Sequence, residues 1–374
     1  MATMKDVAAL AKVGVGTVSR VLNSSGSVKE STRRKVEAAM KELNYIPNAY
    51  ARGLKMNKTN TVALIIPTIW HPFFSEFAYY VESNLAEHKY KMLLCNSDVS
   101  SDKELEYIQM VQENKVDGII GITYSDLDNF VSSHLPFVTI DRHFKEETVC
   151  VTSDNFHAGQ LAVEKLVEKG CHKLGYVGTH SRFPTETTKR RDGFKAKAEQ
   201  MGMPYAIYDG EDPVIEFKQE IRTFFEENPD VDGVFAHTDF IALDILEVLD
   251  ELKRKVPEEV QIIGCDGIKM EAGRKQFLST IRQPVDLMAK AAVEKIIQVI
   301  DGEPVKTKIT LPVHYLEGST TKNEILKQSV FCIDRKRLLN YYRFKSKTYF
   351  FEAKWKRFNY RINVSLFLKS RAGW

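Results

Sequence analysis

Polar side chains interrupt the short segment VGTVSRVLN, residues 15–23, at a spacing that suits contact with nucleic acid. They carry hydroxyl, guanidinium and amide groups, which hold phosphate oxygens and read base edges. Arg20 is the best candidate for reading a base, because its guanidinium is a strong donor. The alternative is that the segment is only the solvated face of a small helix. The polar residues are Thr17, Ser19, Arg20 and Asn23.

A second set of candidate residues consists of carboxylates that end short apolar runs. In a parallel sheet, such positions meet at the carboxyl edge, where open α/β folds bind ligands. Carboxylates at this edge accept hydrogen bonds from the hydroxyl groups of a polar ligand. The sequence therefore indicates a ligand site at the end of a sheet. The residues are Asp98, Asp141, Asp154, Asp239 and Asp266.

Enzyme and metal-site motifs are absent from the sequence. The GxG at Gly14 and Gly16 precedes a helical pattern and lacks a third glycine, and there is no GxxxxGK[ST], GxSxG or HExxH. The cysteines form no CxxC pair, so we expect buried free thiols without disulfides or zinc. We predict no catalytic residue, no cofactor and no bound metal. The cysteines are Cys95, Cys150, Cys171, Cys265 and Cys332.

The elements that position the first set form a small helical head. Thr3 and Asp6 match a capping box that starts a first helix. After a break at Val13 and Gly14, a second helix of about nine residues is expected to bury Val15, Val18 and Leu22. Ser31 is expected to cap a third helix, with Val36, Met40 and Leu43 on its apolar stripe. Two short helices joined by a tight turn and braced by a third predict a helix-turn-helix.

The elements that position the second set alternate between apolar runs and helical stretches from residue 61 onward. Continuous apolar strands separated by helices predict parallel sheets that are covered on both faces. About 260 residues exceed one such sheet, so we expect two Rossmann-like lobes. The runs are VALIIP, KMLLCNSD, DGIIGIT, PFVTID, VCVTSD, KLGYVG, YAIYDG, DGVFAHTD, VQIIGCDG and LPVHYLE.

Charge divides the 374 residues into three parts. Residues 1–60 carry a net charge of +7, residues 61–322 carry −14 and residues 323–374 carry +10. A basic head favours nucleic acid as a partner. No apolar run reaches the roughly 18 residues of a membrane span, and MATMKDVAAL lacks the core of a signal peptide. We therefore expect a soluble, cytoplasmic protein without a membrane partner.

The head resembles the DNA-binding headpiece of LacI-type transcriptional repressors over residues 1–56. The resemblance rests on DVA, TVSRVLN and LNYIPN at their spacing, with ARGL following. It implies that a hinge helix lies within 47–60, with Leu54 as an apolar wedge in the minor groove. It implies base contacts by Val15, Gly16 and Arg20, phosphate contacts by Thr3, Thr17, Asn23 and Ser31, and hinge contacts by Asn48, Leu54 and Lys55.

The turn of the head departs from this family. Lys12, Val13 and Gly14 stand where the family usually has Gly, Val and Ser. If Lys12 takes the left-handed conformation of the usual glycine, it costs roughly 1 kcal/mol. Gly14 in place of a serine cap costs a few tenths of a kcal/mol more. We therefore expect DNA binding to depend strongly on backbone contacts and on Arg20.

The body is similar to the sugar-binding core of LacI-type repressors and to periplasmic sugar-binding proteins. Matching segments include KELEYIQMVQENKVDGII, SDN, RRDGF, HTDFIALDIL, GCDG and TIRQP. Such a site suits a carbohydrate, because carboxylates and arginines bond vicinal hydroxyls and aromatic rings cover the C–H side of a sugar ring. The resemblance implies an effector cleft lined by Phe73, Phe74, Arg142, Asp154, Arg190, Asp239, Asp266 and Gln283.

The resemblance implies a homodimeric repressor that binds double-stranded palindromic operator DNA and responds to a sugar or sugar phosphate. Sucrose or a related fructoside is the first expectation for the effector, and ribose is the next. Two alternatives stay open: a catabolite-control regulator with a phosphoprotein co-repressor, and a sugar-binding protein without DNA function. An α/β enzyme would leave the head unexplained.

The predicted fold class is α/β, with an all-α helix-turn-helix headpiece followed by two Rossmann-like lobes resembling periplasmic binding proteins. The expected domains are the headpiece (1–46), the hinge helix and linker (47–60), and the sugar-binding and dimerisation core (61–322). Residues 323–374 hold 12 of the chain's 39 aromatic residues. We interpret them as a basic, aromatic extension that is foreign to the fold.

Overall fold

The computed structural model describes residues 2–22, 25–45, 58–113, 115–132, 134–145, 148–268 and 276–322. The predicted contacts of Asn23, Asn48, Leu54 and Lys55 lie outside these residues, as do Cys332 and the extension 323–374. The chain divides into two compact units. The first unit contains residues 1–151 and 289–309, and the second unit contains residues 152–288 and 310–374.

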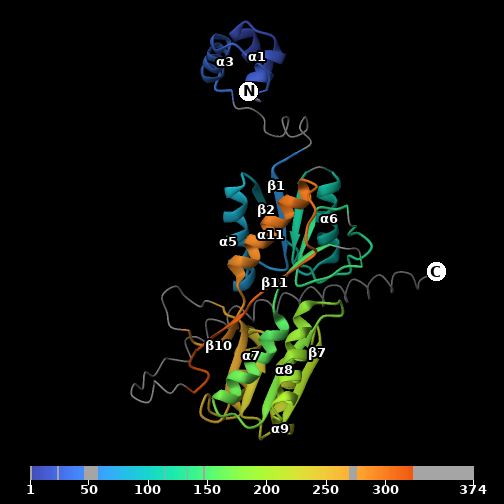
Figure 1. Cartoon of the computed structure of the whole chain (residues 1–374), viewed down its shortest axis with the longest axis vertical. Coiled ribbons are helices and arrows are strands. Elements are labelled where there is room, and N and C mark those ends of the chain that lie inside the picture. Colours follow the sequence, from blue (N-terminus) through green and yellow to red (C-terminus); the bar gives the residue numbers. More distant parts are fainter. Residues whose placement is uncertain are drawn as a thin grey trace, which may run out of the picture. The chain divides into compact units, whose positions relative to one another are not determined.

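The headpiece, residues 2–45, is a bundle of helices around one apolar core (Figure 1). Thr3 caps the first helix: its hydroxyl accepts from the Asp6 amide at 3.3 Å, and its amide donates to the Asp6 carboxylate at 2.7 Å. The predicted capping box is therefore confirmed. Each helix contributes a fully buried valine to the core, Val7, Val18 and Val36. The helices are α1 (Met4–Ala11), α2 (Val15–Leu22) and α3 (Glu30–Glu42).

The turn after α1 places Lys12 in the left-handed conformation, with φ 53° and ψ 47°. The Val13 amide donates to the Ala8 carbonyl at 3.0 Å, which closes the end of the helix. The expectation that Lys12 takes the left-handed conformation is confirmed.

Two expectations for the headpiece are wrong. Val15 is 42% exposed, and Val21 is buried beside Val18 instead, because α2 begins at Val15 and its inward stripe falls on the later residues. Ser31 does not cap α3, which begins one residue earlier. The Lys29 carbonyl accepts the first amides of that helix, so Ser31 lies within its exposed first turn.

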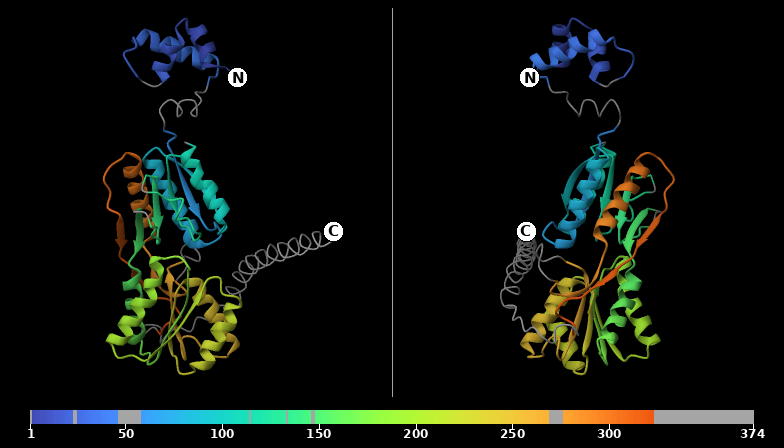
Figure 2. Two further views of the ribbon diagram at one scale, coloured as in Figure 1. Left: turned by 90° about the vertical axis from the view of Figure 1, so that its right-hand side faces the viewer. Right: turned by 60° about the vertical axis from the view of Figure 1, so that its left-hand side comes forward.

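The first unit contains a sheet in the order β11-β5-β4-β3-β1-β2, with helices on both faces (Figure 2). β1 pairs in parallel with β2 and β3, and β4 pairs in parallel with β3 and β5. Ala63 and Ile65 of β1 pack with Ile108 of α6 on one face. The strands and helices are β1 (Thr61–Ile66), α5 (Pro72–Glu87), β2 (Lys91–Asn96), α6 (Ser101–Gln112), β3 (Gly118–Gly121), β4 (Phe137–Ile140), β5 (Val149–Ser153), α11 (Val285–Ile300) and β11 (Lys308–Leu311). Residues 152–153 of β5, 285–288 of α11 and 310–311 of β11 belong to the second unit.

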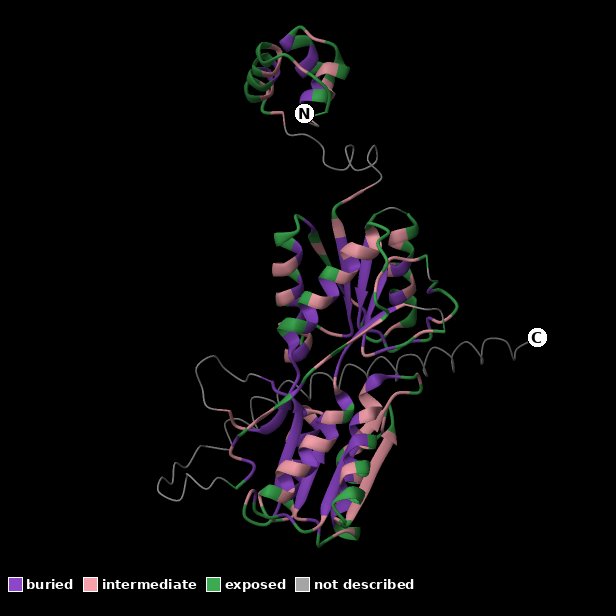
Figure 3. Cartoon of the chain, viewed as in Figure 1, coloured by how far each residue is buried: buried purple, intermediate pink, exposed green. Residues whose placement is uncertain are grey.

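The second unit contains a sheet in the order β12-β10-β9-β8-β6-β7, parallel in its described pairs except that β12 runs antiparallel to β10. Helices α7 and α8 share a core with one face, and α9 and α10 share a core with the other. The strands β8, β9 and β10 between them are buried, whereas the edge strand β7 is half-buried (Figure 3). The elements are α7 (Asn155–Glu168), β6 (Leu174–His180), the 3-10 helix η1 (Glu186–Thr188), α8 (Lys189–Gln200), β7 (Tyr205–Glu211), α9 (Phe217–Glu227), β8 (Gly233–Ala236), α10 (Asp239–Glu251), β9 (Gln261–Asp266), β10 (Ser279–Arg282) and β12 (His314–Leu316).

The predicted fold class is confirmed: a helical headpiece precedes two α/β lobes with largely parallel sheets. A strand overlaps each of the apolar runs of the body. The sequence did not reveal β10 and β11 as strands. The reason is that STIR and KITL contain polar residues, although the residues of β10 are all buried in its sheet.

Candidate functional site

The exposed part of α2 carries the residues predicted to contact bases. Arg20 and Gly16 are exposed, and a Cβ added at Gly16 would meet no atom within 4 Å. Val15 is exposed at the start of the helix, and Thr17 is half-buried. Thr3 has a structural role as well, because its hydroxyl donates to the Asp6 carboxylate at 2.8 Å. The residues predicted to contact bases therefore lie on an accessible helix surface.

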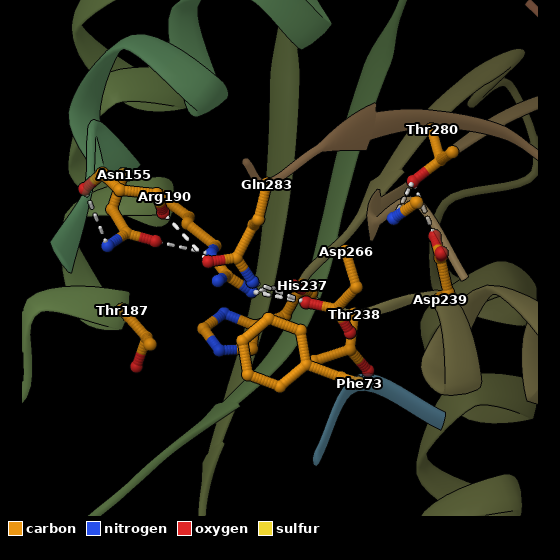
Figure 4. Close-up of polar contacts among 12 residues, drawn as sticks. Phe73, Asn155, Thr187, Arg190, His237, Thr238, Asp239, Asp266, Thr280 and Gln283 are labelled. Atoms are coloured by element: carbon orange, nitrogen blue, oxygen red, sulfur yellow. Dashed lines mark hydrogen bonds and ion pairs between the residues drawn. The ribbon is translucent and has the colours of Figure 1, made fainter. Parts of the chain in front are cut away.

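Arg190 of α8 joins several elements of the second unit (Figure 4). Its Nε donates to Asn155 Oδ1 at 2.7 Å, and its Nη1 donates to the His237 carbonyl oxygen at 2.8 Å. The same Nη1 lies 3.7 Å from Asp266 Oδ1. Both partners of this ion pair are buried, so the charges attract in a low-dielectric surrounding and hold each other in place.

Gln283 extends this arrangement along the carboxyl edge of the sheet. Its Nε2 donates to Asp266 Oδ1 at 2.7 Å, and its Oε1 accepts from Ser153 Oγ at 2.8 Å. Asp266 ends β9, and Gln283 directly follows β10. The structure thus brings together three of the predicted effector residues, Arg190, Asp266 and Gln283. We call these three, with Ser153 and Asn155, the polar cluster of the second unit.

Close packing of α7 against α8 holds two members of this cluster. A Cβ at Gly159 of α7 would lie 2.0 Å from the Arg190 carbonyl oxygen, and one at Gly193 of α8 would lie 1.9 Å from the Phe156 carbonyl oxygen. Only glycine allows the two backbones to approach so closely. The glycine of RRDGF therefore places Arg190 within reach of Asn155.

Two predicted effector carboxylates have structural partners instead. Asp154 caps α7, because its Oδ1 accepts from the His157 amide at 3.0 Å. Asp239 is fully buried, and its oxygens accept from Thr280 Oγ1 at 2.6 Å and the Ile268 amide at 2.7 Å. Burial raises the pKa of Asp239 to about 6. Neither contact joins these carboxylates to Arg190, Asp266 or Gln283, and their role toward an effector stays a prediction.

Gly264 makes the Asp239 contact possible. A Cβ at Gly264 would lie 2.2 Å from Asp239 Oδ1. The glycine of GCDG therefore leaves room for a carboxylate from the neighbouring element. The space at Gly264 therefore determines that the Asp239 carboxylate packs against the neighbouring strands.

The first unit holds the remaining predicted effector residues. Arg142 is buried, its Nη1 donates to the Thr123 carbonyl at 3.2 Å, and its guanidinium lies 4.5 Å from the centre of the Phe144 ring. Burial lowers the pKa of Arg142. Phe73 is buried and Phe74 is half-buried, with ring centres 5.6 Å apart. These contacts lie within the first unit.

Sequence reasoning missed Ser153, Asn155 and His237 as members of the site region. The segments SDN and HTD were recognised, but Asp154 and Asp239 were chosen from them. The preference of aspartate for helix N-caps would have assigned Asp154 to the cap. The flanking Ser153 and Asn155 then remain for the polar cluster.

Metal and membrane features are not found in the described part of the chain. Among these residues no group of His, Cys, Asp and Glu side chains gathers as a metal site would require. No helix there has the length and apolar character needed to cross a bilayer. Cys95, Cys150, Cys171 and Cys265 are buried free thiols, which confirms the prediction for these four.

Comparison with known proteins assigns both parts of the chain. Residues 3–48 match the family described as bacterial regulatory proteins, lacI family, and residues 163–321 match a periplasmic binding protein-like domain. A sucrose operon repressor of Streptococcus mutans is 35% identical over 321 residues, covering 86% of this chain and 99% of that protein. A ribose operon repressor of Bacillus subtilis is 35% identical over 327 residues, covering 87% and 100%.

A solved structure shows the same architecture. The transcriptional regulator CelR in complex with cellobiose is 27% identical, with a TM-score of 0.62, covering 86% of this chain and 100% of that one. The fold, with its helical headpiece and two α/β lobes, and the similarity to relatives over nearly their full length therefore indicate the same family. The chain belongs to the lacI family of bacterial regulatory proteins and is a transcriptional repressor of that family.

Proposed function

We propose that this repressor binds operator DNA through its headpiece and that a neutral carbohydrate, bound at the polar cluster of the second unit, controls its DNA affinity. The observation that carries the proposal is the buried network of Arg190, Asp266 and Gln283 at the carboxyl edge of a parallel sheet. Open α/β folds bind ligands at this edge. The network offers a cation, a carboxylate and an amide, which are the groups that bond sugar hydroxyls.

The charges of this cluster favour a neutral sugar over a sugar phosphate. The Arg190 guanidinium is opposed by the Asp266 carboxylate at 3.7 Å. The guanidinium of Arg282 donates to the Gly267 carbonyl. A phosphate carries up to two negative charges and would have to approach the Asp266 carboxylate. A hydroxyl group can instead donate to the carboxylate and accept from the guanidinium.

The names of the relatives support a choice among candidate effector sugars. The similar repressors are named for sucrose and ribose operons, and the CelR structure holds cellobiose. We rank sucrose or a related fructoside first and ribose second. The catabolite-control alternative would instead need a phosphoprotein co-repressor, and it predicts no release of DNA by a free sugar.

For the DNA partner, we propose a double-stranded, palindromic operator read by a homodimer, as a two-fold protein matches a two-fold site. Apolar side chains support a partner surface on the first unit. Leu93 and Leu94 are 40% and 36% exposed on the edge strand β2, and Tyr79 of α5 is 67% exposed. Large exposed apolar side chains mark protein interfaces.

A repressor must be in the compartment that contains its operator DNA, so we propose a cytoplasmic location.

The proposed control follows from linkage. If the sugar favours one arrangement of the two units, and the hinge segment 47–60 fits DNA in the other, then sugar binding releases the operator. Coupling between two such sites is typically about 1 to 3 kcal/mol, or roughly 5- to 150-fold in DNA affinity.

The test measures operator release against sucrose, D-fructose, D-ribose and their phosphates by fluorescence anisotropy, with duplex DNA selected from a random pool. Isothermal titration of the same panel with wild type and Arg190→Ala shows where the sugar binds. We expect a neutral sugar to release DNA and Arg190→Ala to abolish its binding. A panel without any binder would refute the carbohydrate proposal.

The headpiece is tested separately by gel shift with Arg20→Ala. Its control is Arg34→Ala, which removes the same charge from the exposed surface of α3, where Arg34 pairs with Glu30. We expect Arg20→Ala to lower affinity and relax sequence preference, by about 1 to 3 kcal/mol for a base contact. Unchanged affinity and preference would remove Arg20 from the base-reading role. A steep fall of affinity with salt is expected for both proteins.

A further inference from the structure

His237 connects the polar cluster to the core of the second unit. Its backbone amide donates to the Val177 carbonyl at 2.9 Å, and its carbonyl accepts from Arg190 at 2.8 Å. Its ring Nδ1 lies 2.7 Å from the hydroxyl oxygen of Tyr176. Tyr176 is fully buried, and His237 is 7% exposed. The imidazole is therefore fixed at Nδ1 from the core side, close to the guanidinium of Arg190 (Figure 4).

Room for this pair depends on Gly178, which follows Val177 in β6. A Cβ at Gly178 would lie 2.7 Å from the Tyr176 hydroxyl and 2.8 Å from His237 Cβ. The glycine leaves space for the tyrosine and the histidine to meet. The hydrogen bond between them is therefore built into the sheet.

The hydrogen bond selects the tautomer of His237. A buried phenol that only accepted from Nδ1–H would leave its own O–H without an acceptor, which costs about 1 to 3 kcal/mol. The bond with the lower free energy has the Tyr176 hydroxyl donating to Nδ1. The proton of the neutral ring then resides on Nε2. Tyr176 thus acts as a positioning residue for the His237 ring.

The ring stays neutral in this surrounding. Burial, followed by the nearby charges of Arg190 and Arg191, lowers the pKa of His237 well below its usual value. Burial also raises the pKa of Tyr176 well above its usual value, so the phenol keeps its proton. An imidazolium beside Arg190 would add a second buried cation.

We propose that His237 is a specificity-determining residue that donates its Nε2–H to an oxygen of the bound carbohydrate, in a tautomer fixed by Tyr176. The inference rests on the proposed function and names a further contact of that site. The donor is uncharged, so it suits a hydroxyl or ring oxygen.

The first test determines the tautomer of the His237 ring in wild type and in Tyr176→Phe. The ¹⁵N shifts of selectively labelled histidine in the ligand-free full-length chain distinguish the two neutral tautomers. We expect His237 to be protonated at Nε2, and we expect Tyr176→Phe to produce a mixture of tautomers. A wild-type ring protonated at Nδ1 overturns the proposal.

The second test measures affinity by titration with sucrose, D-fructose and D-ribose. His237→Gln keeps an N–H donor near the position of Nε2, and His237→Phe keeps a planar ring without a donor. We expect affinity within about 3-fold of wild type for His237→Gln and a loss of about 10-fold or more for His237→Phe. Operator binding without sugar serves as the folding control. Equal sugar affinities of wild type and His237→Phe overturn the role of His237 while leaving the proposed function intact. A wild-type chain that binds none of the sugars overturns the proposed function and this inference with it.

Discussion

Each α/β unit buries one arginine of the predicted effector set, and the two are held in different ways. Arg142 of the first unit donates to the Thr123 carbonyl and lies over the Phe144 ring. Arg190 of the second unit lies 3.7 Å from the carboxylate of Asp266 and donates to two further oxygens. Both side chains are 2% exposed. Burial is therefore equal, but the partners differ.

The difference lies in how many polar side chains converge on each arginine. Around Arg190, side chains from α7, the end of β9 and the residue after β10 converge with the backbone after β8. Such convergence fixes donors and acceptors before a ligand arrives, which lowers the cost of binding. Arg142 is held by the carbonyl and hydroxyl oxygens of Thr123 and by the Phe144 ring, and the carboxylates of Asp128, Glu104 and Asp126 act on its charge. We therefore expect the second unit to dominate effector specificity.

The largest expected effect comes from removing each arginine in turn. Arg190→Met leaves the Asp266 carboxylate buried without its cation, which should lower the free energy of unfolding by about 3 to 5 kcal/mol. Arg142→Met removes the donor to the two Thr123 oxygens, and the expected loss from these hydrogen bonds is about 1 to 3 kcal/mol. Urea unfolding of the full-length variants measures both. Equal losses, or a larger loss for Arg142→Met, would contradict the difference between the units.

The N-caps of α5 and α7 give a second contrast, because the two capping side chains respond differently to pH. His71 caps α5 with its Nδ1, which accepts from the Phe73 amide at 3.2 Å, whereas Asp154 caps α7. Burial lowers the pKa of His71 to about 4. The folded state therefore favours neutral His71, and this contribution is complete above the unfolded pKa of about 6.5 and is lost as pH falls through about 4.

We expect the first unit to lose up to about 3 kcal/mol of stability from His71 between pH 7 and pH 4. His71→Asn keeps a capping acceptor that does not titrate, so its unfolding free energy should fall less over this range. Denaturation at a series of pH values measures the difference. His88→Asn, at the exposed other end of α5, is the control and should follow wild type. Parallel pH profiles of wild type and His71→Asn would show that the cap does not titrate as expected.

A glycine in the close contact between α7 and α8 can be compared with a glycine on the exposed surface of α2. Gly193→Ala places a Cβ 1.9 Å from the Phe156 carbonyl oxygen, so the helices must separate. The expected loss is about 1 to 3 kcal/mol, with weaker sugar binding because Arg190 moves away from Asn155. Gly16→Ala meets no atom within 4 Å and should stabilise α2 by about 0.5 to 1 kcal/mol. Thermal unfolding distinguishes the opposite signs, and two losses of equal size would refute the packing argument.

The body and the site differed in how far the sequence could predict them. Apolar runs predicted the strands of both lobes, but β10 was missed because its buried residues include Ser279, Thr280 and Arg282. Strand-end position predicted Asp266, and the family resemblance implied Arg190 and Gln283. Strand-end position could not separate Asp266 from Asp239, since that depends on Gly264 leaving room for a carboxylate from another element. Local pattern predicts an edge of a sheet, and tertiary packing decides which side chain faces the ligand.

The smallest expected effect concerns the headpiece, where the chain departs from its family in the turn. Lys12 holds φ 53° and ψ 47°, a conformation that costs a non-glycine residue about 1 kcal/mol. Lys12→Gly should remove that cost, and Lys12→Ala should keep it while also removing the charge. Amide hydrogen exchange of buried Val18 in the full-length chain reports opening of the headpiece. We expect about 5-fold slower exchange for Lys12→Gly than for Lys12→Ala, which corresponds to about 1 kcal/mol. Because both variants lack the lysine charge, equal exchange rates would mean that the left-handed backbone of residue 12 does not limit the stability of this turn.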